Sequence, residues 1–251
     1  MIELGRQDGI VVMRLAHGSA NALDLELISA IVERFRALDE ASVDAVVLTG
    51  KERMFSAGVD LNRLVGGGAD YVRAFLPALH LLYDTVFNFR RPVVAAINGH
   101  AIAGGCILAC CADRRIAAES AGRIGVTELL VGVPFPAMAF EVMRFATAPE
   151  HFSAVMFNGV TFPPQQALER GLIDEIVPAD ALLRSALAAA RQLASLPTRT
   201  FELTKQQMRQ PVADRMSSHG RRNDTAAEEI WTAPETLERV RVYTERMLKK
   251  T

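Results

Sequence analysis

The sequence predicts an α/β protein, and two observations carry this prediction. Short segments rich in β-branched residues alternate with segments of helical periodicity, a pattern typical of sheets covered by helices rather than of bundles or sandwiches. Of the 251 residues, 50% are hydrophobic and 23% are charged, which excludes a disordered or collagen-like chain. This length accommodates one large α/β core with a helical extension.

Six short segments have the apolar character of strands. Residues 92–97 are apolar throughout, as expected for a strand buried on both faces. Turn residues mark the segment ends, as Gly50 does after the second segment. In chain order, the predicted strands are residues 9–15, 45–48, 92–97, 115–117, 123–125 and 176–177.

Helical periodicity fills most of the intervals between these strands. Asp24 is the expected N-cap of the first helix, and Gly171 suits the end of a later one. Residues 55–61 are interpreted as a turn into a helix, and the three consecutive glycines at residues 66–68 as a loop between that helix and the next. The predicted helices are residues 25–38, 70–87, 103–112, 137–145, 150–157, 164–170 and 181–196.

The chain changes character near Pro197. Beyond it the composition is charged and helical, with no further strand signal, so we divide the chain into a core of residues 1–197 and a helical region of residues 198–251. An apolar stripe on the last helix needs a partner surface, either the chain's own core or a second copy. We expect self-association. The stripe consists of Leu237, Val240, Met247 and Leu248.

Charge and hydropathy exclude several classes of protein. Lys and Arg number 28 and Asp and Glu 29, a balance that argues against a nucleic-acid partner. The longest apolar stretch, residues 101–112, is interrupted by glycines and is shorter than the ~20 residues that cross a membrane. Glu3, Arg6 and Asp8 interrupt any signal peptide. The cysteines, Cys106, Cys110 and Cys111, lack a metal or CxxC spacing, so we expect a reduced, cytoplasmic protein.

Common catalytic motifs are missing from the sequence. It contains no GxGxxG, GxxxxGK[ST], HExxH or GxSxG pattern, and its five histidines show no metal spacing, so we expect no metal. Cys106 has no accompanying histidine and acid and is expected to be a core residue. Asp60 suits an N-cap or a salt bridge, and Asp113 the solvated end of a helix.

Two glycine-containing turns and one acid are better candidates for chemistry. Residues 56–59 and 103–106 would each expose backbone N–H groups at a helix start, where a developing oxyanion binds well. Either turn alone also fits a tight connection. Glu128 lies among apolar residues, which would raise its pKa from ~4.3 toward that of a general base. A loop glutamate that caps a helix or pairs with Arg123 in solvent is an equal alternative.

Four motifs follow one another along the chain: Asn21-Ala22-Leu23, SAGVDL at residues 56–61, NGHAIAGGC at residues 98–106 and IGVTE at residues 124–128. In this combination the sequence resembles the crotonase superfamily, also called the enoyl-CoA hydratase/isomerase family, over nearly its whole length. The resemblance implies a spiral of ββα units with a helical C-terminal oligomerisation region, forming a homotrimer or a dimer of trimers.

The resemblance also implies a site for an acyl-CoA, with no cofactor beyond the CoA of the substrate itself. The N–H groups of Val59 and Gly104 would hold the thioester oxygen. Ala22, Ala57 and Asp60 would contact the CoA portion. Lys205 or Arg209 of the C-terminal region could approach the CoA phosphates, although a solvated helical face is the expected role of its charges. The other implied substrate contacts are Ser56, Gly58 and Gly105 in the same turns, and Leu61, Leu64, Leu129 and Phe135 as acyl-pocket walls.

One departure from the family pattern bears on the reaction. Hydratases of this family use two glutamates to hold and activate water, and the position of the first is Ile107 here, whereas Glu128 fills the second. A single glutamate is similar to the Δ3,Δ2-enoyl-CoA isomerases, so the resemblance implies that Glu128 moves a proton from C2 to C4 of a fatty 3-enoyl thioester. The alternatives are hydration or another family reaction on an unusual acyl-CoA, and a non-catalytic scaffold.

Overall fold

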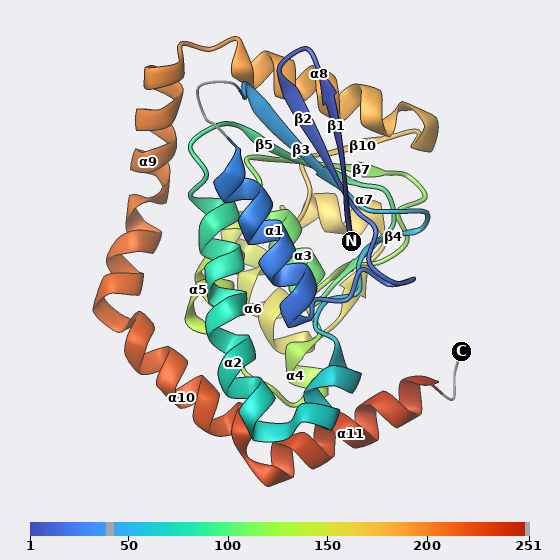
Figure 1. The fold of residues 1–251 in the computed structure, drawn as a ribbon, viewed down its shortest axis with the longest axis vertical. Helices are drawn as coiled ribbons and strands as arrows, with labels where there is room; N and C mark the ends of the chain where they lie inside the picture. The colour runs from blue at the N-terminus through green and yellow to red at the C-terminus, as the bar shows by residue number, and fades with distance from the viewer. Residues whose placement is uncertain (39–42, 249–251) are drawn as a thin grey trace.

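A six-stranded sheet forms one end of the molecule (Figure 1). The computed structural model describes residues 1–38 and 43–248. The strand order is β1-β2-β3-β5-β7-β10, antiparallel between β1 and β2 and parallel elsewhere. Every residue of β3 and β5 is buried, which explains their uniformly apolar sequences. The strands are β1 (Ile2–Gln7), β2 (Ile10–Leu15), β3 (Ala45–Thr49), β5 (Val93–Ile97), β7 (Arg114–Ala118) and β10 (Glu175–Val177).

A second, smaller sheet has the order β4-β6-β8-β9. Its strands are β4 (Met54–Ser56), β6 (His100–Ile102), β8 (Ile124–Gly125) and β9 (Thr161–Phe162). Three times in succession the chain passes from a strand of the large sheet to a strand of the small sheet and then to a helix: β3-β4-α2, β5-β6-α3 and β7-β8-α4. These repeats are the ββα units that the resemblance implies. Each brings a turn to the same edge of the small sheet.

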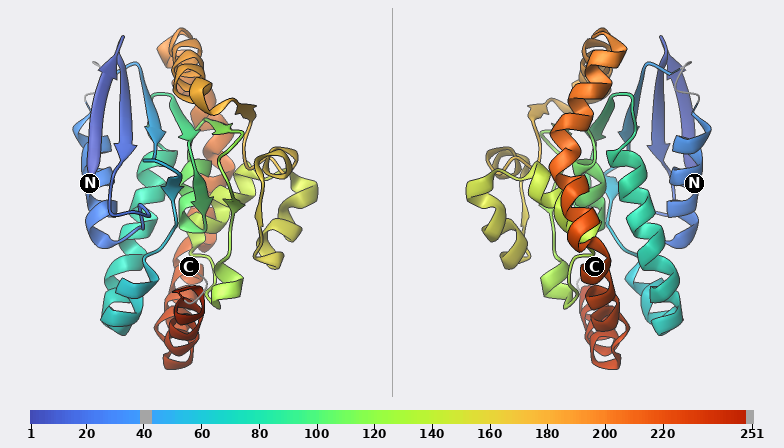
Figure 2. Two further views of the ribbon diagram at one scale, coloured as in Figure 1. Left: turned by 90° about the vertical axis from the view of Figure 1, so that its right-hand side faces the viewer. Right: turned by 90° about the vertical axis from the view of Figure 1, so that its left-hand side faces the viewer.

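The helices of the core pack around these sheets. Helices α1 and α2 lie side by side, and α8 packs against β3, β5 and β7 (Figures 1 and 2). The Asp24 side chain accepts from the Leu27 N–H and caps α1, as predicted. No helix within the described ranges is long and apolar enough to cross a membrane. The helices are α1 (Leu25–Ala37), α2 (Leu61–Phe87), α3 (Gly104–Cys110), α4 (Glu128–Val131), α5 (Ala137–Ala146), α6 (Pro149–Asn158), α7 (Pro164–Glu169) and α8 (Leu182–Ala194).

The C-terminal helices form an arc around the core (Figure 1). They are α9 (Thr198–Arg215), a π-helical turn η2 (Met216–Gly220), α10 (Arg221–Thr232) and α11 (Pro234–Leu248). Helices α10 and α11 pack on α2, and α11 also contacts α4. Val240 is fully buried and Leu237 packs partly on the core, so the chain itself covers this part of the stripe. The side chains of Met247 and Leu248 lie outside the described residues, and self-association stays a prediction.

The glycine run inside α2 differs from the prediction. A helix begins at Leu61 with Asp60 as its N-cap, as predicted, but it continues through residues 66–68, where we expected a loop, into the helix predicted from residue 70. Of the three glycines, Gly68 alone leaves the helical region, with φ 59° and ψ −152°. Because glycine tolerates positive φ, the chain bends there and continues as helix. The sequence reasoning did not identify β1, β4, β6, β9 or α4, which are short or, like β1, largely exposed.

Candidate active site

Hydrogen bonds from the segment before α1 shape the turn at residues 56–60. Asn21 adopts a φ of 45°, and its side-chain amide donates to the carbonyls of Met54 and Phe55, each at 3.2 Å. The Ser56 hydroxyl donates to the Asn21 carbonyl at 2.8 Å and accepts from the Gly58 N–H at 3.2 Å. Asn21 and Ser56 are therefore scaffold residues that fix where this turn lies.

The backbone N–H of Val59 points away from the segment that pairs with it. Leu23 and Val59 form a parallel bridge, in which the Leu23 N–H donates to Gly58 and the Asp60 N–H donates to Leu23. In a parallel bridge of this kind the N–H of the bridged residue points away from the neighbouring strand. Within residues 1–38 and 43–248, the Val59 N–H has no hydrogen-bond acceptor.

The second turn lies directly against the first. Gly104 begins α3, so its N–H has no intrahelical acceptor, and no other acceptor is present among the described residues. A Cβ on Gly58 would stand 2.9 Å from the Gly104 nitrogen, and one on Gly105 would stand 2.3 Å from the Ser56 oxygen. The glycines therefore allow the two backbones to touch. The structure brings together the two turns predicted from sequence.

Strand pairing brings Glu128 to the same region. The Ala103 N–H donates to the Gly125 carbonyl at 2.8 Å, so the segment that leads to Glu128 runs beside the start of α3. The Glu128 side chain is buried, and its Oε2 has no hydrogen-bond partner in the described chain. Removal from water raises the pKa of Glu128 to about 7. Of the two alternatives from sequence, the buried acid is confirmed, and Arg123 instead bonds to Thr161.

Tyr83 of α2 is a site residue that sequence reasoning missed. Its side chain is 1% exposed, and its hydroxyl donates to the Gly104 carbonyl at 3.1 Å. Burial, and the charge of Glu128, raise the pKa of Tyr83 well above its usual value. In the sequence it is one more residue of the apolar stripe of α2, and only the long-range contact with α3 distinguishes it.

The remaining predicted contacts fall into two groups. Ala22, Ala57 and Asp60 are half-buried along the first turn, where Asp60 also accepts from the Arg63 N–H at 3.0 Å. Leu61 and Leu64 pack into the core at the start of α2. Leu129 is instead 42% exposed and lines, with Phe135, a surface groove of about 350 Å³ between α4, α6 and α10. Their role as acyl-pocket walls stays a prediction.

Asp113 is not solvated, and the prediction for it is wrong. Its carboxylate accepts from Lys205 at 2.6 Å, from Arg209 at 2.7 Å and from the Val93 N–H at 2.8 Å. Lys205 and Arg209 are themselves 7% and 5% exposed, so neither belongs to a solvated helical face. The three residues anchor α9 beyond the C-terminal end of α3, whereas Gly104 lies at its other end. They are part of the fold rather than of the oxyanion site.

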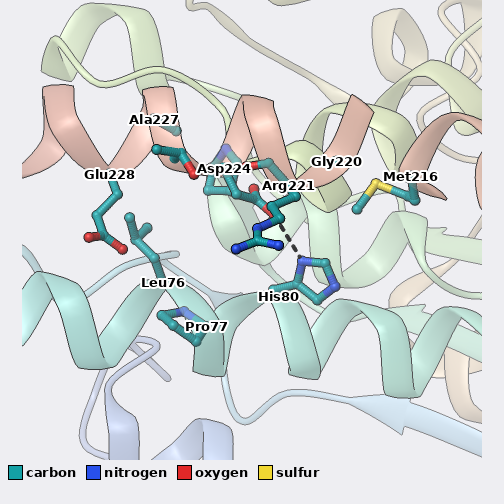
Figure 3. A pocket seen from close by; sticks show the side chains of 11 residues that line it. Leu76, Pro77, His80, Met216, Gly220, Arg221, Asp224, Ala227 and Glu228 are labelled. Atoms are coloured by element: carbon teal, nitrogen blue, oxygen red, sulfur yellow. Dashed lines mark hydrogen bonds and ion pairs between the residues drawn. The ribbon is translucent and has the colours of Figure 1, made fainter. Parts of the chain in front are cut away.

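A separate cavity of about 560 Å³ lies between α2 and α10 (Figure 3). His80 and Asp224 face each other across it, 3.4 Å apart, and the hydrogen bond with Asp224 raises the pKa of His80. Asp224 also accepts from the Ala137 N–H at 2.7 Å. Neither Gly104 nor Glu128 lines this cavity. It marks the junction between the C-terminal helices and the core.

Two amides without an acceptor in the described part of the chain, and a neighbouring carboxyl of raised pKa, suit one kind of chemistry. The amides can stabilise an oxyanion that develops on a carbonyl. A carboxyl whose pKa is near neutrality can remove a proton from carbon and return it. Together they fit proton abstraction next to a carbonyl group.

Comparison with known proteins finds relatives that are named isomerases and relatives that are named hydratases. The chain is 29% identical over 219 residues to human "Enoyl-CoA delta isomerase 1, mitochondrial", covering 86% of this chain and 72% of that protein. It is 29% identical over 209 residues to the 2,3-dehydroadipyl-CoA hydratase of Escherichia coli (strain K12), covering 82% and 81%. Identity therefore does not separate the two activities.

The fold agrees with that of a solved relative along the whole chain. The crystal structure of human mitochondrial delta3-delta2-enoyl-CoA isomerase matches with a TM-score of 0.94 and 26% identity, covering 100% of this chain and 99% of that one. The predicted α/β fold class and the crotonase resemblance are thereby confirmed. Residues 5–248 also match the model of one family, "Enoyl-CoA hydratase/isomerase". The chain therefore belongs to the enoyl-CoA hydratase/isomerase family, the crotonase superfamily.

Proposed function

We propose that this crotonase-family acyl-CoA enzyme is a Δ3,Δ2-enoyl-CoA isomerase with Glu128 as its only acid–base group. The observation that carries the proposal is the combination of a buried Glu128 carboxyl, whose Oε2 has no partner among the described residues, with an apolar residue at position 107. Ile107 is 2% exposed, and its side chain can neither hold water nor give a proton. Hydration would require a second polar group at this position.

The reaction needs one proton to move and no cofactor. The Glu128 carboxylate removes a proton from C2 of a 3-enoyl thioester, and the C–H electron pair becomes part of a dienolate. The negative charge develops on the thioester oxygen, where the N–H groups of Val59 and Gly104 would stabilise it. The protonated Glu128 then gives its proton to C4. The double bond now joins C2 and C3, and the enzyme has returned to its starting state.

The burial of Glu128 supports the two halves of this cycle. A pKa of about 7 leaves both the carboxylate and the acid accessible near neutral pH, as a group that first accepts and then donates a proton requires. Exclusion of water also prevents exchange of the proton or its loss to solvent between the two steps. Helix α11, which packs on both α2 and α4, helps to keep this region dry.

Substitution of Glu128 tests the proposal directly. Purified enzyme is mixed with a 3-enoyl-CoA, and the absorbance of the conjugated 2-enoyl thioester is followed. Because general acid–base catalysis contributes ~10²–10⁴-fold, Glu128→Gln should lose at least about 100-fold in turnover. Glu119→Gln, at an exposed position, is the control and should turn over like the wild type. Equal rates for Glu128→Gln and wild type would remove Glu128 from the reaction.

The same purified proteins also test two alternative functions, hydration and a non-catalytic scaffold. The E. coli hydratase relative makes hydration of a 2-enoyl-CoA the second candidate. We expect hydration to be slower than isomerisation by about 100-fold or more, since Ile107 replaces one of two water-holding groups. Hydration at the faster rate would replace the isomerase proposal. Failure to bind any acyl-CoA in calorimetry would instead support a non-catalytic scaffold.

Self-association is also part of the proposal. Phe157 is 75% exposed and lies with Leu129 and Ile230 in the apolar groove between α4, α6 and α10, a surface that favours a second copy. Light scattering should give the mass of a trimer or of a dimer of trimers. Phe157→Asp should shift the population toward monomer, and a monomeric wild type would contradict the proposal. The cytoplasmic location stays a prediction for cell fractionation.

A further inference from the structure

Tyr83 touches the proposed oxyanion donor Gly104 in two ways. Its hydroxyl donates to the Gly104 carbonyl at 3.1 Å. The same oxygen lies 2.8 Å from the point where a Cβ on Gly104 would stand. The Tyr83 side chain of α2 thus fills the space that a side chain on Gly104 would occupy. This contact explains why position 104 has no side chain.

A glycine at the start of a helix needs outside contacts to hold its N–H in one direction. Glycine loses more conformational freedom on ordering than any other residue. The preceding Ala103 has a φ of 51° and a ψ of −126°, which costs energy for a residue with a side chain. The Ala103 N–H is held by Gly125, and the Gly104 carbonyl is held by Tyr83. These two bonds fix the backbone on both sides of the Gly104 N–H.

The phenol of Tyr83 stays a hydrogen-bond donor at working pH. Burial, together with the neighbouring charge of Glu128, raises the pKa of Tyr83 well above its usual value, so the hydroxyl remains neutral. A neutral phenol has one hydroxyl hydrogen to donate, and here the carbonyl of Gly104 accepts that hydrogen bond. Catalysis is sensitive to such placement, since a misplacement of ~1 Å at a reacting centre can cost ~10²-fold in rate.

We propose that Tyr83 is a positioning residue, whose hydrogen bond to the Gly104 carbonyl aims the Gly104 N–H at the thioester oxygen. The expected effect of Tyr83 on turnover rests on the proposed function. The effect of Tyr83 on the carbonyl of a bound thioester does not depend on which reaction follows. Tyr83 acts through Gly104 and takes no part in the transfer of the proton between C2 and C4.

The test compares Tyr83→Phe with Tyr71→Phe. Tyr71 is also on α2, and its hydroxyl accepts from the Leu25 N–H at 3.4 Å, away from Gly104. For each variant we would measure kcat and KM on a 3-enoyl-CoA. We would also measure the red shift in absorbance when a conjugated 2,4-dienoyl-CoA binds, because hydrogen bonds to the carbonyl polarise the conjugated system. The shift is recorded per bound ligand, so partial loss of folded protein does not alter it.

We expect Tyr83→Phe to lower kcat about tenfold, with KM changed less than about threefold, because the bond affects the charge that develops in the transition state. The red shift should shrink in Tyr83→Phe and stay unchanged in Tyr71→Phe. A full red shift in Tyr83→Phe would overturn the proposal, whatever its turnover. If neither the wild type nor Tyr83→Phe converts a 3-enoyl-CoA while the red shift still depends on Tyr83, the proposed isomerase reaction fails and the positioning role stands.

Discussion

Gly58 packs so closely on Gly104 that a Cβ on Gly58 would stand 2.9 Å from the Gly104 nitrogen and 2.7 Å from the Ile102 oxygen. Gly58 also has a φ of 84°, which residues with a side chain rarely adopt. The contact joins the two turns that carry the unpaired N–H groups. Any side chain at this position must separate them.

Gly58→Ala is therefore expected to reduce both stability and turnover. Left-handed strain costs about 1–2 kcal/mol, and crowding adds about 1–3 kcal/mol, so urea unfolding should give a free energy lower by more than 2 kcal/mol. Gly18→Ala is the matched control, since Gly18 also has positive φ but nothing within 4 Å of its would-be Cβ. It should show the strain alone and keep full activity. Equal losses in both variants would contradict the close contact.

The pKa of Glu128 predicts how rate depends on pH. The carboxylate must be ionised to remove the proton, so kcat/KM should rise with pH and reach half of its plateau near pH 7, where Glu128 titrates. A profile that is flat between pH 5 and 8 would show that another group is the base. The pH dependence of kcat/KM, followed with a 3-enoyl-CoA, gives the answer.

The same pKa predicts a stability effect of known sign. Folding raises the pKa of Glu128, so its contribution is fully present below the unfolded pKa of ~4.3 and is lost as pH rises through about 7. Between these values the wild type should lose stability relative to Glu128→Gln, by about 3 kcal/mol in total. Urea unfolding of both proteins at pH 5 and pH 8 measures the difference. A difference that does not change with pH would contradict the raised pKa.

The buried ion pairs of Asp113 predict that Asp113→Asn strongly lowers the free energy of unfolding. Asp113→Asn would leave the buried Lys205 and Arg209 without their carboxylate, and removing one partner of a buried ion pair costs about 3–5 kcal/mol. Burial already lowers the pKa of Lys205 to about 8, which shows how closely its charge depends on Asp113. The exposed pair of Asp70 and Arg73 supplies the control: Asp70→Asn should change the unfolding free energy by less than about 1 kcal/mol.

Local features of the site were predictable from sequence. Each glycine turn comes a few residues after a fully buried apolar strand, β3 or β5, and Glu128 is an acid among apolar neighbours. These signals are short-range, so the turns at residues 56–59 and 103–106 were predicted correctly, whereas the burial of Glu128 was one of two equal alternatives that only the structure decides. The N-cap at Asp24 was also predicted correctly, because it too depends on residues close by in the sequence.

Long-range contacts were not predictable in this way. Asp113 and Lys205 are 92 positions apart, and nothing near Asp113 in the chain indicates that a cation reaches it. Tyr83 meets Gly104 across 21 positions and fits the helical stripe of α2 without it. The continuity of α2 through residues 66–68 was missed because glycines usually end helices, whereas here only Gly68 leaves the helical conformation.

The position of α11 has a consequence for how the enzyme is made. This helix packs on α2 and α4, yet it comes about a hundred residues after Glu128 in the chain. A ribosome completes both glycine turns and Glu128 well before it synthesises the helix that packs on α2 and α4. The nascent polypeptide therefore contains Glu128 and both turns before α11 is available to pack on α2 and α4.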